Sequence, residues 1–167
     1  MITAAVITVS DKGSRGERED VSGPVLDKLL SEMGAEVVAY HIIPDERDEI
    51  MAQLTELTDE QGIDLIMTTG GTGPSPRDVT PQATRAVIER EMPGLTELMR
   101  LEGYQRFIPF AVFSWAIAGI RGHTLIVNLP GNPKAVRESM ELLAPLLPAA
   151  LALIRGEAPL DGICKAP

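Results

Sequence analysis

Two aspartates, Asp45 and Asp78, each follow an apolar run and precede a stretch with helical periodicity. A pair of carboxylates in such places can hold Mg²⁺, which binds proteins through one or two carboxylates and completes its shell with substrate oxygens. Each also has a structural alternative, because aspartate is a preferred helix N-cap and braces tight turns. Their common position after strand-like runs favours a metal-assisted phosphate site over two unrelated caps.

A glycine-rich stretch, 70–73, lies between the apolar run 63–69 and Asp78. Glycines in such a place let backbone amides approach an anion, since no Cβ intrudes. The spacing matches neither the P-loop, which needs Gly-Lys-Ser/Thr, nor the dinucleotide loop, whose third glycine is replaced here by Pro76. A tight turn without a ligand is the alternative. The sequence also has no His-x-x-x-His, Cys-x-x-Cys or Gly-x-Ser-x-Gly pattern, which excludes the common zinc sites and serine hydrolases.

Polar residues follow two further apolar runs. Ser10 and Asp11 open a charged loop that reaches Ser22, and long polar loops at strand ends are often binding loops. Asn128, Pro130 and Gly131 belong to a loop that follows the last apolar run. The alternatives are a solvated surface loop with Ser22 as a helix cap, and a turn shaped by proline and glycine. Trp115, close to two phenylalanines, is expected in the core or at an interface.

The elements that position these residues alternate between strand-like and helix-like stretches. The expected strands are 2–9, 36–43, 63–69, 117–120 and 124–129, and the expected helices are 24–33, 46–59, 81–91, 93–103, 133–143 and 149–154. Thr80 is the expected N-cap of the third helix. The alternation predicts one α/β domain over 1–167, with three layers and a mostly parallel sheet covered on both faces. Ligands bind such sheets at the carboxyl ends of the strands, where the candidate residues follow.

Charge and composition limit the classes of partner. The formal net charge is −9, which argues against nucleic acid as a ligand and requires any phosphate to be held by local groups. Cys164 is the only cysteine, so no internal disulfide is possible. The apolar start of the chain lacks a basic segment and is too short to span a membrane. We therefore expect a soluble, cytoplasmic protein without a membrane association.

Five ordered motifs resemble the signature of the molybdenum cofactor biosynthesis family, which includes bacterial MogA and MoaB and the G domain of gephyrin. They are Ser10–Asp11, Asp20-x-Ser22–Gly23, Pro44–Asp45–Glu46, the pair Thr69–Gly73 and Arg77–Pro81, and Asn128–Gly131. The similarity covers the chain from Ile2 to Gly156, approximately. It implies a three-layer α/β fold, a homotrimer and molybdopterin adenylyltransferase activity. In that reaction the terminal phosphate of molybdopterin attacks the α-phosphorus of ATP, pyrophosphate leaves, and Mg²⁺ is the required cofactor.

The resemblance also implies a role for each matching residue. Asp45 and Asp78 match the two essential aspartates and are the implied metal ligands. The implied nucleotide-binding residues are Gly70, Gly71, Thr72, Gly73, Asn128, Pro130 and Gly131, and the implied substrate-binding residues are Ser10, Asp11, Ser22 and Ser114. Molybdopterin and ATP are the implied ligands, and a molybdenum-insertion protein is a further implied partner.

One dipeptide departs from the family pattern. Members commonly have Ser-Arg where this chain has Ser114–Trp115, so a cation near the ligands is lost unless Arg77, Arg121 or Lys134 replaces it. This departure keeps open a MoaB-like protein that binds molybdopterin but adenylylates it weakly or not at all. Two more hypotheses are an enzyme for nucleotide derivatives, like the competence-damage-inducible domains, and a dinucleotide oxidoreductase, which lacks its fingerprint. The choice between a molybdenum and a tungsten pathway also stays open.

Overall fold

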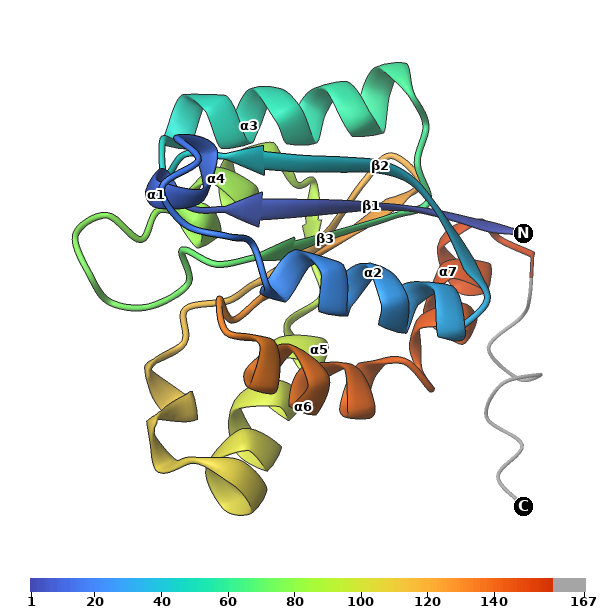
Figure 1. Ribbon diagram of the computed structural model, residues 1–167. Coiled ribbons are helices and arrows are strands. Elements are labelled where there is room, and N and C mark those ends of the chain that lie inside the picture. The colour runs from blue at the N-terminus through green and yellow to red at the C-terminus, as the bar shows by residue number, and fades with distance from the viewer. Residues whose placement is uncertain (158–167) are drawn as a thin grey trace.

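Six strands form one sheet in the computed structural model of the chain, which describes residues 1–157 (Figure 1). They are β1 Ile2–Val9, β2 Ala35–Ile43, β3 Leu65–Thr69, β4 Arg90–Glu91, β5 Ala118–Arg121 and β6 Thr124–Leu129, in the order β2-β1-β3-β6-β5-β4. The first four strands in that order are parallel to one another, whereas β5 is antiparallel to β6 and β4 is antiparallel to β5. The predicted mostly parallel α/β sheet is thus confirmed. Cys164 lies outside the described residues.

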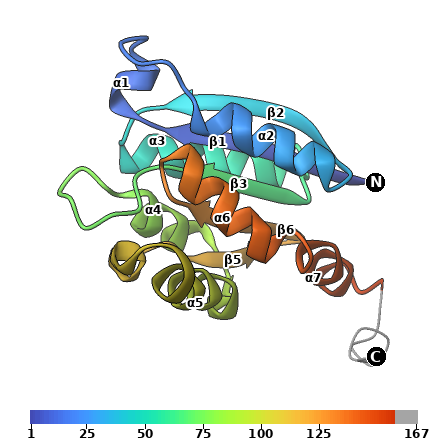
Figure 2. The same ribbon diagram turned by 60° about the horizontal axis from the view of Figure 1, so that its bottom comes forward.

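Helices cover both faces of the sheet. The longer ones are α2 Ser22–Glu32, α3 Arg47–Thr55, α4 Thr80–Val87, α5 Pro93–Glu102, α6 Pro133–Leu143 and α7 Leu147–Ile154. The shorter ones are α1 Asp11–Ser14, the π-helical turns η1 Glu56–Glu60 and η2 Gly103–Phe107, and the 3₁₀ turn η3 Pro109–Phe113. One face carries α3 and α4, and the other carries α2, α5, α6 and α7 (Figures 1 and 2). The three predicted layers are therefore present.

Each helical layer has its own core, because successive strand residues point to opposite faces. In β1, Ala4 and Val6 pack toward α2 and α6, whereas Ala5 and Ile7 pack toward α3 and α4. All four side chains are fully buried. A central strand with both faces covered needs such a continuous apolar run. The loop that follows it is therefore attached to a fully buried strand.

The predicted helix 81–91 is wrong in its second half. It ends at Val87, and Ile88 adopts an extended conformation before the edge strand β4. Pairing with β5 decides this, since the Glu89 and Met92 amides donate to the Ile120 and Ala118 carbonyls at 2.8 Å each. Met92 also precedes Pro93, which disfavours helical backbone at that position. Long-range pairing of this kind leaves no periodic signal in the local sequence.

Three other boundaries differ from the prediction near the candidate site. The helix expected from Pro24 begins at Ser22, and the charged loop before it contains the one-turn helix α1. Thr80 is the first residue of α4 instead of its N-cap, and its hydroxyl donates to the Gly70 carbonyl at 3.0 Å. Segment 104–113, for which the sequence predicted no element, belongs to η2 and η3, and η2 begins at Gly103, the last residue of the predicted helix 93–103.

Candidate active site

A polar cavity of about 390 Å³ lies at the carboxyl ends of β1, β3 and β6. The predicted site residues that line it are Ser10, Ser22, Asp45, Gly70, Gly71, Asp78 and Gly131. They come from loops that are far apart in the sequence and meet at the edge to which the strand arrows of Figure 1 point. The cavity is where a parallel sheet of this kind binds its ligands.

The glycine loop between β3 and α4 is held in a conformation that only glycine adopts easily. Gly70 and Gly71 have φ angles of 102° and 66°, in the left-handed region. A Cβ on Gly70 would collide with the Val9 carbonyl, and a Cβ on Gly71 would collide with the Thr80 hydroxyl and lie 3.0 Å from an Asp45 carboxyl oxygen. The loop is therefore packed against the end of β1 and against Asp45, and positions 70 and 71 have no room for a side chain.

Asp45 is held by Asp11 and does not cap a helix. The Asp11 amide donates to the Asp45 carboxylate at 2.9 Å, and the Asp45 amide donates to the Asp11 carboxylate at 3.0 Å. The N-cap position of α3 belongs to Glu46, so the capping alternative for Asp45 is wrong. Burial raises the pKa of Asp45, and the negative charges of Asp11 and Asp78 raise it further. The site thus concentrates negative charge on a half-buried carboxylate.

Asp78 braces its own loop and also faces the cavity. Its carboxylate accepts a hydrogen bond from the Ser75 amide at 3.2 Å, and its amide donates to the Ser75 carbonyl at 2.9 Å. It lies close enough to Asp45 to raise the pKa of that group. The turn-bracing role and a ligand-binding role are therefore compatible. Within residues 1–157, no group of three or more His, Cys, Asp or Glu side chains is arranged to hold a metal ion.

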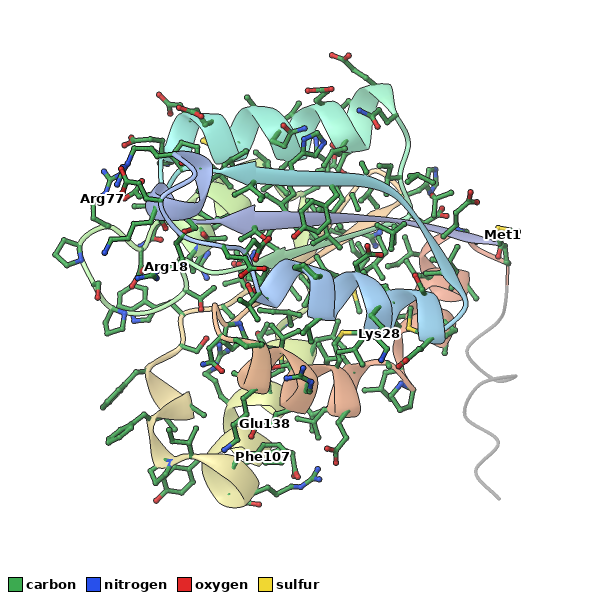
Figure 3. The ribbon with its side chains drawn as sticks, viewed as in Figure 1. Met1, Arg18, Lys28, Arg77, Phe107 and Glu138 are labelled. Atoms are coloured by element: carbon green, nitrogen blue, oxygen red, sulfur yellow. The ribbon has the colours of Figure 1, made fainter. Side chains whose placement is uncertain are left out.

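Arg77 ties the glycine loop to the neighbouring acidic residues. Its guanidinium donates to both oxygens of Asp11, at 3.1 and 2.9 Å, and to Glu46 at 2.8 Å. This bidentate pair holds the pKa of Asp11 below its ordinary value. Figure 3 shows Arg77 and Arg18 at the same edge of the molecule, and Arg18 lines the polar cavity. Sequence reasoning missed Arg18 as a cation of the site, because it looked like one charge in a solvated loop.

Asp20, also missed as a site residue, anchors the loop that forms one wall of the cavity. Its carboxylate accepts hydrogen bonds from Thr8 Oγ1 at 2.6 Å, from the Gly23 amide at 3.0 Å and from the Tyr40 hydroxyl. Burial, and then the hydrogen bond to Asp20, raise the pKa of Tyr40. A Cβ on Gly23 would collide with Tyr40 and Asp20. The Asp-x-Ser-Gly motif is therefore a packing unit that closes onto β1 and β2.

A second cavity, of about 260 Å³, adjoins the first and is mostly apolar. Its walls include Phe107, Phe110 and Phe113, and Asn132 lines both cavities. The predicted site residues Thr72, Gly73, Ser114 and Pro130 line this second cavity instead of the polar one. The candidate site is thus divided into a polar part and an aromatic part.

Asn128, in β6, is not among the residues that line the two cavities. Its side chain is fully buried, donates to Thr68 Oγ1 at 3.0 Å and to Thr84 Oγ1 at 2.9 Å, and accepts from the Ile117 amide at 3.2 Å. All of these contacts are within the protein. The arrangement gives Asn128 the role of joining β6 to β3 and α4, and the ligand-facing part of its motif is Pro130 and Gly131.

Arg100 is a cation that lies beside the Ser114–Trp115 dipeptide. Its guanidinium donates to the Ala116 carbonyl at 2.8 Å and to the Ser114 carbonyl at 3.4 Å, and it lines the apolar cavity. Among the replacements suggested from the sequence, Arg121 is wrong, because it lies at the opposite edge of the sheet and pairs with Asp59 at 2.6 Å. Arg100 was missed because it looks like a surface residue of an amphipathic helix.

Trp115 and Lys134, two further residues singled out from the sequence, are both largely exposed. The Trp115 side chain is 57% exposed, so the core prediction for it is wrong and the interface prediction stays untested. Lys134 is 81% exposed and lies 3.7 Å from Glu138. Neither side chain therefore supplies a buried group to the polar cavity.

The chain matches a family model described as a probable molybdopterin binding domain over residues 5–149. It belongs to this family. A molybdopterin adenylyltransferase of Helicobacter pylori strain J99 is 43% identical to it over 157 residues, which cover 93% of this chain and 89% of the relative. The predicted resemblance is confirmed.

Solved structures of the family share the fold of this chain. The molybdopterin biosynthesis enzyme MoaB of Thermus thermophilus is 51% identical, with a TM-score of 0.88 and coverage of 93% of this chain and 98% of the other. The tungsten cofactor synthesizing protein MoaB of Pyrococcus furiosus is 36% identical, with a TM-score of 0.84 and coverage of 92% and 97%. Both proteins therefore share the arrangement of layers. In residues 1–157 of the present family member, no helix is long and apolar enough to cross a membrane.

Proposed function

We propose that this protein is a molybdopterin adenylyltransferase. It transfers AMP from ATP to the terminal phosphate of molybdopterin and releases pyrophosphate. The observation that carries the proposal is the union of a polar cavity, lined by glycines and aspartates, with an aromatic cavity at Asn132. Such a pair suits a substrate with a phosphate at one end and a ring system at the other. The name of the 43% identical relative supports the same activity.

The donors around the polar cavity fit Mg²⁺. Asp45 and Asp78 both line the polar cavity and offer carboxylate oxygens, the ligand type that Mg²⁺ prefers. The two aspartates would hold the ion, which supplies positive charge against the phosphate oxygens. This arrangement lets an acidic protein bind two anionic substrates, because the acids recruit the metal ion.

The remaining residues of the cavity position the reacting groups. A phosphate oxygen of molybdopterin forms a bond to the α-phosphorus of ATP, and the bond from that phosphorus to the pyrophosphate oxygen breaks. Gly70, Gly71 and Gly131 bring backbone close to these phosphates, and Arg18 offers a positive charge at the rim. Catalysis of phosphoryl-type transfer depends mainly on such positioning and charge neutralisation. Arg77 keeps Asp11 paired, and Asp11 in turn orients Asp45.

A weakly active molybdopterin-binding protein is the second candidate. One feature favours it: Trp115 stands where the family resemblance places an arginine, so that cation is absent. The first candidate is preferred, because Arg100 supplies a cation beside Ser114.

We also propose a homotrimer in the cytoplasm. An apolar patch supports self-association, with the exposed side chains Ile108, Phe110, Val112, Phe113 and Trp115. The consumption of ATP supports the cytoplasmic location. The adenylylated product is an activated intermediate, so a molybdenum-insertion protein is the expected receiving partner.

The test is direct. Purified protein is incubated with molybdopterin and Mg²⁺-ATP, and adenylylated molybdopterin and pyrophosphate are measured together. The first candidate predicts equal amounts of both products, over many turnovers. Binding of molybdopterin with no more than one equivalent of adenylylated product would instead support the second candidate.

A further inference from the structure

Arg18 is the one basic residue in the wall of the polar cavity, as far as residues 1–157 form that wall. The other charged residues that line the cavity are acidic, namely Glu19, Asp20, Asp45 and Asp78. Within this wall, the Arg18 guanidinium is therefore the side chain that can attract a phosphate by its own charge.

The Arg18 guanidinium is not engaged by any acidic neighbour. Arg18 is exposed, and it forms no ion pair with a carboxylate of residues 1–157. Two other arginines at this edge do form such pairs, since Arg15 lies 2.8 Å from Glu17 and Arg77 lies 2.9 Å from Asp11. The N–H donors of Arg18 are thus left for a ligand or for water.

The backbone is held on both sides of Arg18. On one side, the Glu17 amide donates to the Lys12 carbonyl at 2.9 Å. On the other side, the Asp20 carboxylate accepts a hydrogen bond from Thr8 Oγ1, in the buried strand β1, at 2.6 Å. Arg18 therefore lies on a short bridge between two anchored points, which lowers the cost of ordering it against a ligand.

Depth in the cavity separates the phosphate groups of the proposed reaction. Asp45 is half-buried and Gly70 is buried, whereas Arg18 is exposed at the rim. The α-phosphorus and the molybdopterin phosphate react beside the acids that hold the metal ion. The β- and γ-phosphates leave as pyrophosphate, so they need a path to solvent and lie toward the rim. Figure 3 shows Arg18 at this edge, away from Phe107 and Glu138, which line the aromatic cavity.

We propose that Arg18 binds the β- and γ-phosphates of ATP and holds them as the pyrophosphate leaving group. The inference rests on the proposed function, since that function supplies ATP. When the bond from the α-phosphorus breaks, its electron pair stays on the departing oxygen, and Arg18 keeps its protons. Hydrogen bonds from the guanidinium to the outer oxygens offset part of the charge that pyrophosphate gains. The planar fork of arginine suits two oxygens of a diphosphate.

The first test measures the binding of inorganic pyrophosphate by calorimetry at a fixed excess of Mg²⁺. Arg18→Gln is compared with Arg15→Gln, which removes an equal charge from the same loop at a position that lines neither cavity. Arg18→Gln is expected to bind pyrophosphate about tenfold more weakly than the wild type, as for the loss of hydrogen bonds from a charged group. Arg15→Gln should match the wild type.

Three results of this titration would overturn the proposal. The first is a wild-type protein that does not bind pyrophosphate. The second is an Arg18→Gln protein with wild-type circular dichroism and unchanged affinity. The third is an equal loss of affinity in Arg15→Gln, because that would assign the effect to the overall charge of the loop instead of to contact with Arg18.

Steady-state rates separate this inference from the proposed function. In Arg18→Gln, the KM for ATP and the inhibition constant of pyrophosphate should both rise about tenfold, while the KM for molybdopterin stays near the wild-type value. A rise in the KM for molybdopterin alone would contradict the inference and leave the proposed function intact. A wild-type protein that binds pyrophosphate through Arg18 but forms no adenylylated product would contradict the proposed function alone.

Discussion

At the residue scale, the acidic side chains of the site make structural hydrogen bonds and also line the cavity. Asp78 accepts a hydrogen bond from the Ser75 amide and also faces the cavity, and Asp45 is locked to Asp11 while its pKa is raised by burial and by neighbouring charge. Such groups are placed at the expense of stability, because a raised carboxyl pKa means that the folded state resists ionisation. Asp45 is proposed as a functional residue because its half-buried carboxylate lines the polar cavity and is fixed by Asp11.

Asp45→Asn is predicted to separate stability from activity. An acid whose pKa is higher in the folded state than in the unfolded state loses stabilisation as pH rises through that window. At neutral pH the variant, which keeps an acceptor for the Asp11 amide, should therefore melt at the same temperature as the wild type or higher. The difference should vanish below the ordinary range of aspartate, where both side chains are neutral. Adenylyl transfer should fall by about a hundredfold.

Thermal melting of the metal-free proteins between acid and neutral pH, with the transfer assay at neutral pH, checks this prediction. Glu60→Gln, which removes an exposed carboxylate from η1, is the control. A neutral-pH melting temperature clearly below that of the wild type would show that the Asp45 charge is stabilising, which contradicts the charge balance described for the site.

Prediction from the sequence succeeded for residues whose placement follows from strand ends. Asp45, Asp78 and Gly71 could be placed together because each follows a strand-like run in a parallel sheet. Arg18, Asp20, Arg100 and Glu138 could not, because their positions depend on which loops and helices meet across the sheet. Their types and spacing are those of ordinary surface residues, and only the tertiary structure turns them toward a cavity.

At the element scale, the start of α2 is the part of the fold most tightly fitted to the site. Ser22 and Gly23 are buried, and the Asp20 carboxylate joins Thr8, Tyr40 and the Gly23 amide. This cluster fixes the charged loop to β1 and β2. The helix was predicted from its apolar face, but its first two residues belong to the cluster and carry no periodic signal.

Gly23→Ala is predicted to lower the free energy of unfolding by about 1–3 kcal/mol, as for overpacking of a filled site. The added methyl would collide with Tyr40 and Asp20. Gly94→Ala is the matched control, because that glycine is also in the first turn of a helix, and a Cβ there meets nothing within 4 Å. It should be neutral or stabilising, by up to about 1 kcal/mol. Urea denaturation measures both, and equal effects of the two substitutions would contradict the packing account.

Other elements show which parts of the fold can be predicted from local sequence and which cannot. The strands 2–9 and 124–129 and the helix 133–143 agree with the prediction, because each has a strong apolar pattern and clear boundaries. The edge strand β4 has two exposed charged residues and is defined only by its pairing with β5. The turns η2 and η3 form around exposed aromatic residues, which have no helical periodicity of their own.

At the scale of the whole molecule, the proposed function requires an acidic protein to bind two anionic substrates, and it has two adjoining cavities. The polar cavity concentrates acids and glycines at the carboxyl edge of the sheet, and the aromatic cavity extends from it along α5 and α6. The chain has a net charge of −9, so attraction of phosphate depends on local groups and on the proposed metal ion. The exposed apolar patch shares Ile108, Phe110 and Phe113 with the wall of the aromatic cavity, and Val112 and Trp115 extend it over the surface.

Val112→Glu is predicted to disrupt the proposed trimer. Val112 is 50% exposed within that patch, and a charge there would be desolvated in any interface that covers it. Sedimentation of the wild type should give a species of three 18.0 kDa chains, and the variant should shift toward the single chain. A wild-type protein that sediments only as one chain at micromolar concentration would contradict the trimer.

The most direct measurement of the central claim is made on Asp78→Asn. Asparagine keeps the acceptor for the Ser75 amide, so the free energy of unfolding should change by about 1 kcal/mol or less. It removes the charge that the account assigns to binding Mg²⁺ at the reacting phosphates, so formation of adenylylated molybdopterin at saturating Mg²⁺-ATP should fall by about a hundredfold or more. Molybdopterin binding should change far less than the rate. A near-normal rate in a stably folded Asp78→Asn protein would contradict the account. Asp78 would then have only the structural role of bracing its turn through the Ser75 amide.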